Sequence, residues 1–324
     1  MIPRTATSEI TTDLLPPAPT PTPTPDRYLV FSDTDNDLES VRTTLHFAGI
    51  LSPDGELRDD VEGITIVHTG DLIYKKKPDL CVVRYWQELQ RNIVKKGGHV
   101  RLIAGNHEQE IWLRMKAGKT LISDDEQAQN LKTFIEGLDL FFVAGPVLFM
   151  HGYPTVEFLR TLLHYKEVTG RDLNRFNEDH YKKSLISVRA MKQYSYEREG
   201  RNAKHLLYDV MNTSAYYKKN GHIVDAVLAQ LGIQIVIHGH KPQRSGSQAD
   251  YEFRKWIPGI RMIDNDTNVS RRGIGATVIK ETSAGSFETA FINSNNESSE
   301  LSREACEILG TRGTYWQNPP GPVL

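Results

Sequence analysis

The residues of this chain that could carry out chemistry are carboxylates, one amide and imidazoles, and they lie where short apolar runs end. In layered α/β proteins the carboxyl ends of neighbouring strands face one crevice, where ligands bind. Such a mixture of oxygen and nitrogen donors is typical of a site for hard-to-borderline divalent metal ions. The candidate residues are Asp33, Asp35, Asp71, Asn106, His107, His151, His238 and His240.

A carboxylate among these candidates, such as Asp71, can bridge two metal ions. Two ions ~3.5–4 Å apart clamp a phosphate and lower the pKa of a bridging water, which creates a hydroxide nucleophile. Oxygen donors allow manganese or iron, whereas imidazoles favour zinc or copper. The pattern therefore predicts a phosphoester chemistry that depends on transition-metal ions.

Strands and helices alternate in the first third of the chain, and this alternation predicts a layered α/β fold. Apolar runs that end abruptly in polar residues predict strands over residues 27–33, 63–71 and 99–107. Between these strands, apolar residues at helical spacing predict helices over residues 37–48 and 79–94.

The later part of the body is expected to add a hairpin and further strands. Residues 140–152 predict a hairpin that turns at Gly145 and Pro146. A helix over residues 223–231 leads into a strand over residues 233–240. Three short strands in succession then suggest a second sheet formed late in the chain, over residues 259–264, 275–280 and 287–292.

Proline content divides the chain into a folded body and two tails. Seven of the 16 prolines lie in residues 1–26, and three lie in the last six positions. Because proline fixes φ and removes a hydrogen-bond donor, we expect residues 1–26 to be a disordered Pro/Thr-rich spacer. The expected catalytic domain covers residues 27–295 with an inserted helical cap at 153–220, and residues 296–324 form a C-terminal extension.

Composition and charge argue against several classes of function. A formal net charge of −2 argues against a general nucleic-acid binder. No apolar run reaches the ~18 residues that a membrane span requires. Cys81 and Cys306 provide neither a disulfide framework nor a cysteine-based zinc site. Pro-Thr spacers suit exported proteins, so we favour a periplasmic or exported location over the cytoplasm, and the oligomeric state stays open.

Four short motifs occur in order, each at the end of a predicted strand. They are GDLI at 70–73, GNHE at 105–108, HGY at 151–153 and GHKP at 239–242. With these motifs the sequence resembles the calcineurin-like metallophosphoesterases, most of all their phosphoprotein-phosphatase branch and its bacterial relatives, including the Shewanella-like phosphatases. The resemblance spans residues 28 to about 292. It implies a central β-sandwich flanked by helices, with a dinuclear metal centre at one edge.

The resemblance also implies a role for each matching residue. Asp33 would bind the first metal ion, and Asp71 would bridge both ions. His107 would lie over the phosphate and protonate the leaving alkoxide, or stabilise its charge. The second ion would be bound by Asn106, His151 and His240. The two sites would differ in their donors, so a mixed pair of zinc, manganese, iron or copper ions is expected.

The first motif departs from the family pattern, which is usually Asp-x-His-Gly. Asp35 stands at the histidine position, where a carboxylate could still bind a metal ion. Asn36 replaces glycine in a tight turn, and asparagine is the next best residue for a left-handed backbone. A compensating imidazole could come from His68 or His238, or these two histidines could simply be packed in the interior.

The second motif departs as well, because Tyr74 stands where the family carries the acid that orients the catalytic histidine. The arginine that grips phosphate is replaced by one of the lysines that follow. A lysine offers a point charge rather than a bidentate fork, which should reshape substrate recognition. The expected substrate-binding residues are Asn36, Lys75, Lys76 and Lys218, although some of these lysines could be merely solvated.

These features predict a metal-dependent phosphomonoesterase whose substrate is a small or medium phosphorylated metabolite or natural product. The cap segment 155–219 carries thirteen Lys or Arg against eight Asp or Glu, which would attract an anion, unless it is an ordinary helical hairpin with a charged face. The alternatives are a phosphoprotein phosphatase, a phosphodiesterase or nucleotide pyrophosphatase, and a catalytically weak binding protein. The residues Lys241 and Pro242 after His240 disfavour the phosphodiesterases, which often carry Gly-His-x-His there.

Overall fold

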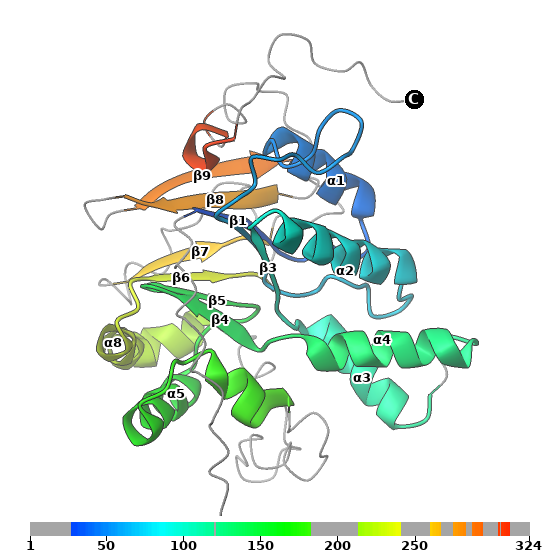
Figure 1. Ribbon diagram of the computed structural model, residues 1–324. Coiled ribbons are helices and arrows are strands. Elements are labelled where there is room, and N and C mark those ends of the chain that lie inside the picture. The colour runs from blue at the N-terminus through cyan, green and yellow to red at the C-terminus, as the bar shows by residue number, and fades with distance from the viewer. Residues whose placement is uncertain are drawn as a thin grey trace, which may run out of the picture.

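Two β-sheets lie face to face at the centre of the molecule (Figure 1). The computed structural model describes residues 27–119, 121–182, 213–240, 260–266, 275–282, 287–293, 304 and 306–311. Buried side chains from both sheets form one apolar cluster between them, which includes Tyr28 and Val30 from one sheet and Phe149 and Ile237 from the other. The alternation of side chains along each strand therefore leaves a second apolar face on each sheet for helices to cover.

The first sheet has five strands in the order β3-β2-β1-β8-β9. The three strands β1, β2 and β3 are parallel, and β8 and β9 continue the sheet in antiparallel fashion. Parallel neighbours require crossover connections, which the helices between these strands provide. The bounds are β1 Arg27–Phe31, β2 Ile64–His68, β3 His99–Leu102, β8 Gly275–Glu281 and β9 Phe287–Asn293.

The second sheet has four strands in the order β4-β5-β6-β7. The strands β4 and β5 form the expected hairpin, with Gly145 at a positive φ of 53° in its turn. The strands β5, β6 and β7 are parallel, so β5 and β6 end at the same edge of the sheet. The bounds are β4 Phe141–Ala144, β5 Val147–Met150, β6 Ile235–His238 and β7 Arg261–Asp264.

Helices cover the outer face of each sheet, which makes a four-layered molecule (Figure 1). The first sheet shares its core with α1, α2, α3 and α4, and the second sheet shares its core with α5 and α8. Side chains cap several of these helices: Asp37 accepts from the Ser40 N–H, and Thr155 accepts from the Phe158 N–H. The bounds are α1 Leu38–Phe47, α2 Leu80–Lys95, α3 Asn106–Lys116, α4 Asp125–Gly137, α5 Val156–Thr169 and α8 Thr213–Leu231, with the π-helix η1 at Asn177–Tyr181.

This arrangement confirms the layered α/β fold with a central sandwich, but it corrects the expected late sheet. The three late strands do not form a sheet of their own. The strand β7 joins the second sheet, whereas β8 pairs with β1 along its whole length and brings β9 into the first sheet. The physical reason is that β1 is almost entirely buried, so the backbone N–H and C=O groups on its edge away from β2 need a partner strand, which β8 provides.

The expected tails and cap are described only in part. Residues 1–26 and 183–212 lie outside the described residues. Of the expected cap, α5 and α8 pack against the second sheet as a layer of the sandwich. Ile308 and Leu309, from the expected C-terminal extension, are buried in the core of the first sheet. Among the described residues, no helix is long and apolar enough to cross a membrane.

Candidate metal centre

Strands from both sheets end at one place, and the polar residues that follow them meet there. The Asp33 N–H donates to the carbonyl oxygen of Gly70 at 2.9 Å, which ties the loops after β1 and β2 together. The Gly239 N–H donates to the His151 carbonyl oxygen at 2.9 Å, and the His240 N–H donates to Asp33 Oδ2 at 2.9 Å. Hydrogen bonds of the backbone thus bind the loops of the two sheets into one site.

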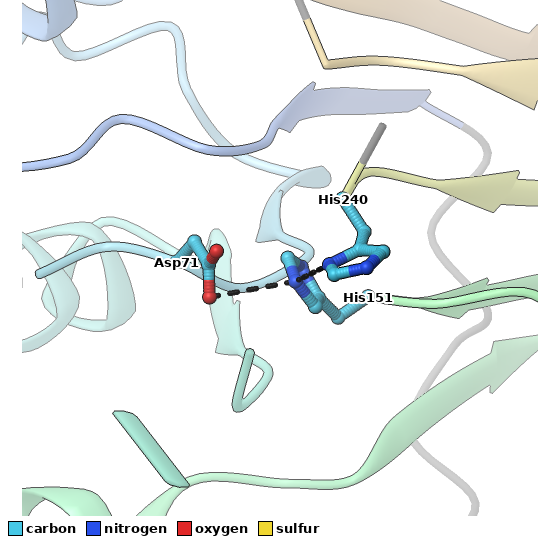
Figure 2. Close-up of side chains that lie close together, drawn as sticks. All are labelled: Asp71, His151 and His240. Atoms are coloured by element: carbon cyan, nitrogen blue, oxygen red, sulfur yellow. Dashed lines mark hydrogen bonds and ion pairs between the residues drawn. The ribbon is translucent and has the colours of Figure 1, made fainter. Parts of the chain in front are cut away.

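Two imidazoles and one carboxylate point their donor atoms at one another, those of His151, His240 and Asp71 (Figure 2). The amide oxygen of Asn106 lies beside both imidazoles. His151 Nε2 lies 2.9 Å from Asn106 Oδ1 and 3.4 Å from Asp71 Oδ1. His240 Nδ1 lies 2.6 Å from Asn106 Oδ1 and 3.2 Å from His151 Nε2. The sequence predicted all four of these residues, and the structure brings them together.

The contacts of the His151 ring indicate that this group of atoms fits a cation. Its Nδ1 lies 3.0 Å from the carbonyl oxygen of Thr69, so Nδ1 carries the proton and Nε2 presents a lone pair. That lone pair faces the acceptor oxygen of Asn106, and two acceptors repel unless a cation lies between them. Burial and the neighbouring His240 lower the pKa of His151, which keeps the ring in the neutral form that a metal ligand needs.

Asp33 and Asp71 add two buried carboxylates to the site, with only 8% and 4% of their surface exposed. Burial raises the pKa of both groups, and the charge of Asp71 raises the pKa of Asp33 further. The ion-pair contacts of Asp71 among the described residues are to histidines, His107 and His151. Buried carboxylates this close together are costly when ionised, and divalent cations would offset that cost.

Asp35, Asp71 and His107 form a second group that could hold a metal ion. His107 Nδ1 lies 2.7 Å from Asp35 Oδ1 and 3.5 Å from Asp71 Oδ2. The backbone N–H of His107 donates to Asp71 Oδ1 at 2.8 Å, so the same carboxylate reaches both groups. Asp71 therefore has the position that a bridging ligand would need.

The backbone around these residues is strained. Positive φ occurs in the described part of the chain at five residues other than glycine, and every one belongs to this site or its loops. They are Asp33 at 50°, Asp35 at 47°, Asn36 at 74°, Asp71 at 54° and His240 at 79°. Such conformations are uncommon outside glycine and concentrate at functional sites. Asn36 therefore adopts the left-handed turn expected at a position where related sequences carry glycine.

The sequence model of the calcineurin-like phosphoesterases matches residues 27–244, which is more than half of the chain. The chain belongs to this family. Its members depend on two metal ions, which agrees with the two groups of donors that share Asp71. No curated protein sequence matches the chain significantly.

Solved structures of cold-active protein-tyrosine phosphatases share this fold. A cold-active protein-tyrosine phosphatase from a psychrophilic Shewanella species has a TM-score of 0.54 at 18% identity, over 82% of this chain and 80% of that chain. Another structure of a cold-active protein tyrosine phosphatase has a TM-score of 0.53 at 18% identity, over 84% and 80%. A protein serine/threonine phosphatase from Saccharomyces cerevisiae has a TM-score of 0.48 at 14% identity, over 85% and 82%.

Glu108 is a residue of the site for which sequence reasoning found no role. Its carboxylate has no exposed surface, and burial raises its pKa. One oxygen accepts from the N–H groups of Gly105 at 2.8 Å and Asp71 at 3.0 Å, and the other accepts from Ile73 at 2.9 Å. A glutamate three residues after a helix N-cap is a known capping signal, and it could have revealed this residue within GNHE.

The two compensating histidines are packed apart from the donor groups. His68 Nδ1 accepts from the Gly70 N–H at 3.2 Å and its Nε2 faces Thr34 Oγ1 at 3.0 Å, so both ring nitrogens are engaged. Its burial lowers the pKa of His68 to about 3. His238 Nδ1 lies 3.1 Å from the Gly239 carbonyl oxygen, and its ring lies 4.1 Å from that of Tyr153. Burial lowers the pKa of His238 to about 4.

The expected substrate-binding residues are placed in different ways. Lys75 Nζ lies 3.3 Å from Glu110 Oε2, while Lys76 is exposed. Lys218 belongs to α8, and its side chain lies outside the described residues. Asn36 stabilises the loop after β2 by two hydrogen bonds. Its Oδ1 accepts from the Tyr74 N–H at 3.1 Å, and its Nδ2 donates to the Lys77 carbonyl oxygen at 2.8 Å.

Proposed function

We propose that this calcineurin-like phosphoesterase is a phosphomonoesterase that uses two divalent metal ions. The observation that carries the proposal is the convergence of His151 Nε2, His240 Nδ1, Asn106 Oδ1 and Asp71 Oδ1 on one point. An arrangement of neutral imidazoles, an amide and buried carboxylates suits transition-metal ions.

The residues divide naturally into two sets of ligands that share Asp71. By resemblance to the family, Asp33 would serve one ion, while Asn106, His151 and His240 would serve the other. When bound, the ions would supply Lewis-acid chemistry, since they neutralise charge on phosphate oxygens and lower the pKa of water. The protein contributes by fixing the ligand atoms in advance through the strained loops that carry them.

His107 is the proposed general acid. Its side chain is 12% exposed, at the rim of the buried carboxylates. Both of its carboxylate contacts are made by Nδ1, to Asp35 and Asp71. The other ring nitrogen, Nε2, would protonate the oxygen of the leaving group, which is the step that a positioned imidazole can accelerate.

The proposed substrate is a small or medium phosphorylated compound. Lys75, whose Nζ lies 3.3 Å from Glu110 Oε2, would offer phosphate a point charge where related enzymes carry an arginine. The proteins with similar folds include enzymes named as protein-tyrosine phosphatases, which makes a phosphotyrosine substrate a second candidate. The Tyr74 ring favours an aromatic substrate, because it lies 5.9 Å from His107, edge-on, beside the proposed acid.

Metal analysis and a comparison of substrates test this function. The purified protein should contain metal ions and hydrolyse p-nitrophenyl phosphate, while bis-p-nitrophenyl phosphate stays intact. Cleavage of the diester at a comparable rate would favour a phosphodiesterase. A panel of phosphorylated metabolites assayed beside a phosphotyrosine peptide would then separate the two candidate substrates.

A further inference from the structure

We propose that Asp35 is the residue that positions His107 for catalysis, and that it does so in place of an acid at position 74. This inference rests on the proposed function, because it concerns the orientation of the proposed general acid. The decisive contact joins His107 Nδ1 to Asp35 Oδ1 at 2.7 Å, which is shorter than the 3.5 Å from His107 Nδ1 to Asp71 Oδ2.

The two atoms have no better partner among the described residues. Asp35 Oδ1 and His107 Nδ1 are both shielded from solvent, and neither makes a hydrogen bond in the described part of the chain. Their contact has the distance of an ion pair, although the angle is not that of a hydrogen bond. Buried polar atoms that lack partners are costly, which favours keeping this contact between the two atoms.

Backbone hydrogen bonds hold the loop that carries Asp35 in place. The Asp35 N–H donates to the Asp71 carbonyl oxygen at 3.0 Å, and the Asn36 N–H donates to the Leu72 carbonyl oxygen at 3.1 Å. These hydrogen bonds hold the loop after β1 next to the loop after β2. The carboxylate of Asp35 is consequently held over the first turn of α3, where His107 lies.

Tyr74 explains why the carboxylate that orients His107 comes from the loop after β1 and not from the loop after β2. It stands where related sequences carry the orienting acid, and its ring packs edge-on against His107 at an interplanar angle of 77°. Its N–H is held by Asn36 Oδ1. The loop after β2 therefore contacts the His107 ring through an aromatic side chain, Tyr74. The carboxylate beside that ring comes instead from Asp35, in the loop after β1.

The competing role for Asp35 is that of a metal ligand, which its place in the group with Asp71 and His107 also permits. The two roles differ in what is lost when the carboxylate is replaced. Loss of a ligand lowers metal content, whereas loss of a positioning residue leaves the metal in place and harms only the transfer of a proton to the leaving group.

The test uses Asp35→Asn in the full chain, because asparagine tolerates the φ of 47° at this position. Asp35→Gly, which also accepts positive φ, is the second variant if the first does not fold. Asp54→Asn, at an exposed aspartate, is the matched control. Each protein is analysed for metal content and assayed on aryl phosphates whose leaving phenols span pKa values from about 5 to about 10.

We expect Asp35→Asn to keep the metal content of the parent and to lose about 10- to 100-fold in kcat on the poorest leaving groups, with little loss on the best. In a His107→Ala background the same substitution should cost less than about twofold, because it acts through the imidazole. Reduced metal content, an equal loss on all leaving groups, or no loss would each overturn the proposal. A metal-loaded parent that cleaves no monoester would overturn the proposed function and this inference together.

Discussion

Glu108 holds the backbone of Asp71, the carboxylate at the centre of the site, through a hydrogen bond of 3.0 Å from the Asp71 N–H to Glu108 Oε2. The same oxygen caps the N–H of Gly105, at the start of α3. One buried carboxylate therefore joins the loop after β2 to the helix that carries Asn106 and His107. The metal ligands and the proposed acid are placed relative to each other by a residue that need not touch the substrate.

Replacing Glu108 with glutamine should weaken the hydrogen bonds that connect the loop after β2 to α3. The amide would turn an NH₂ group towards backbone N–H groups, and a buried donor without an acceptor costs about 1–3 kcal/mol. We expect Glu108→Gln to lower the free energy of unfolding by about that amount, measured by urea denaturation, and to lower metal content. Glu110→Gln on the same helix is the control and should cost less than about 1 kcal/mol. Equal stability of the two variants would contradict the role of Glu108.

Gly105 leaves no room for a side chain. A Cβ at this position would lie 2.1 Å from Asp71 Oδ1 and 2.3 Å from the Asp71 nitrogen. Gly105→Ala should therefore displace Asp71, which we expect to appear as loss of bound metal and of phosphatase activity. Gly137→Ala is the control, because a Cβ there meets nothing within 4 Å. If Gly105→Ala binds metal like the parent, the close approach is not needed for the site.

Removing the imidazole of His107 should slow catalysis without removing metal. General acids of this kind contribute about 10²- to 10⁴-fold, so we expect His107→Ala to lose activity in that range on a monoester with a poor leaving group. His164→Ala, at an exposed position on α5, should behave like the parent. Full monoesterase activity in His107→Ala would show that another group protonates the leaving oxygen.

Removal of metal should destabilise the protein more strongly as pH rises. Burial raises the pKa of Asp33 and Asp71, so without metal the folded chain keeps protons that the unfolded chain releases. By linkage, their contribution to stability falls as pH rises from their ordinary pKa through the raised one. Bound cations favour the ionised carboxylates and prevent this loss.

Thermal unfolding of metal-loaded and EDTA-treated protein checks this expectation. The difference in Tm between the two forms should be larger at about pH 8 than at about pH 5, because metal binding releases protons. A difference that does not change with pH would mean that the carboxylates are already ionised before metal binds.

The strands and the residues of the two donor groups were predictable from the sequence because their signals are local. An apolar run that ends in Asp33 or Asp71 marks both a strand and the polar residue at its carboxyl end. The short motifs then identified the family. Residues such as His151 and His240 were predictable for the same reason, since each closes a buried strand.

Features that depend on distant partners were not predictable. The helix α3 has polar residues among its buried positions, Asn106, Glu108 and Gln109, so its apolar periodicity is interrupted. The division of the late strands follows from the pairing of β8 with β1, which no local pattern contains. The pairing of Lys75 with Glu110 likewise depends on how the loop after β2 meets α3.

The site brings together residues that lie far apart in the sequence. The His240 N–H that donates to Asp33 belongs to a residue 207 positions later in the chain. During synthesis, β1 and β2 leave the ribosome long before β6 exists, and β8 follows later still. Contacts between such distant residues form slowly. A nascent chain would therefore expose its carboxylates before their imidazole partners exist, so the full set of candidate ligands becomes available to metal only once the chain has folded.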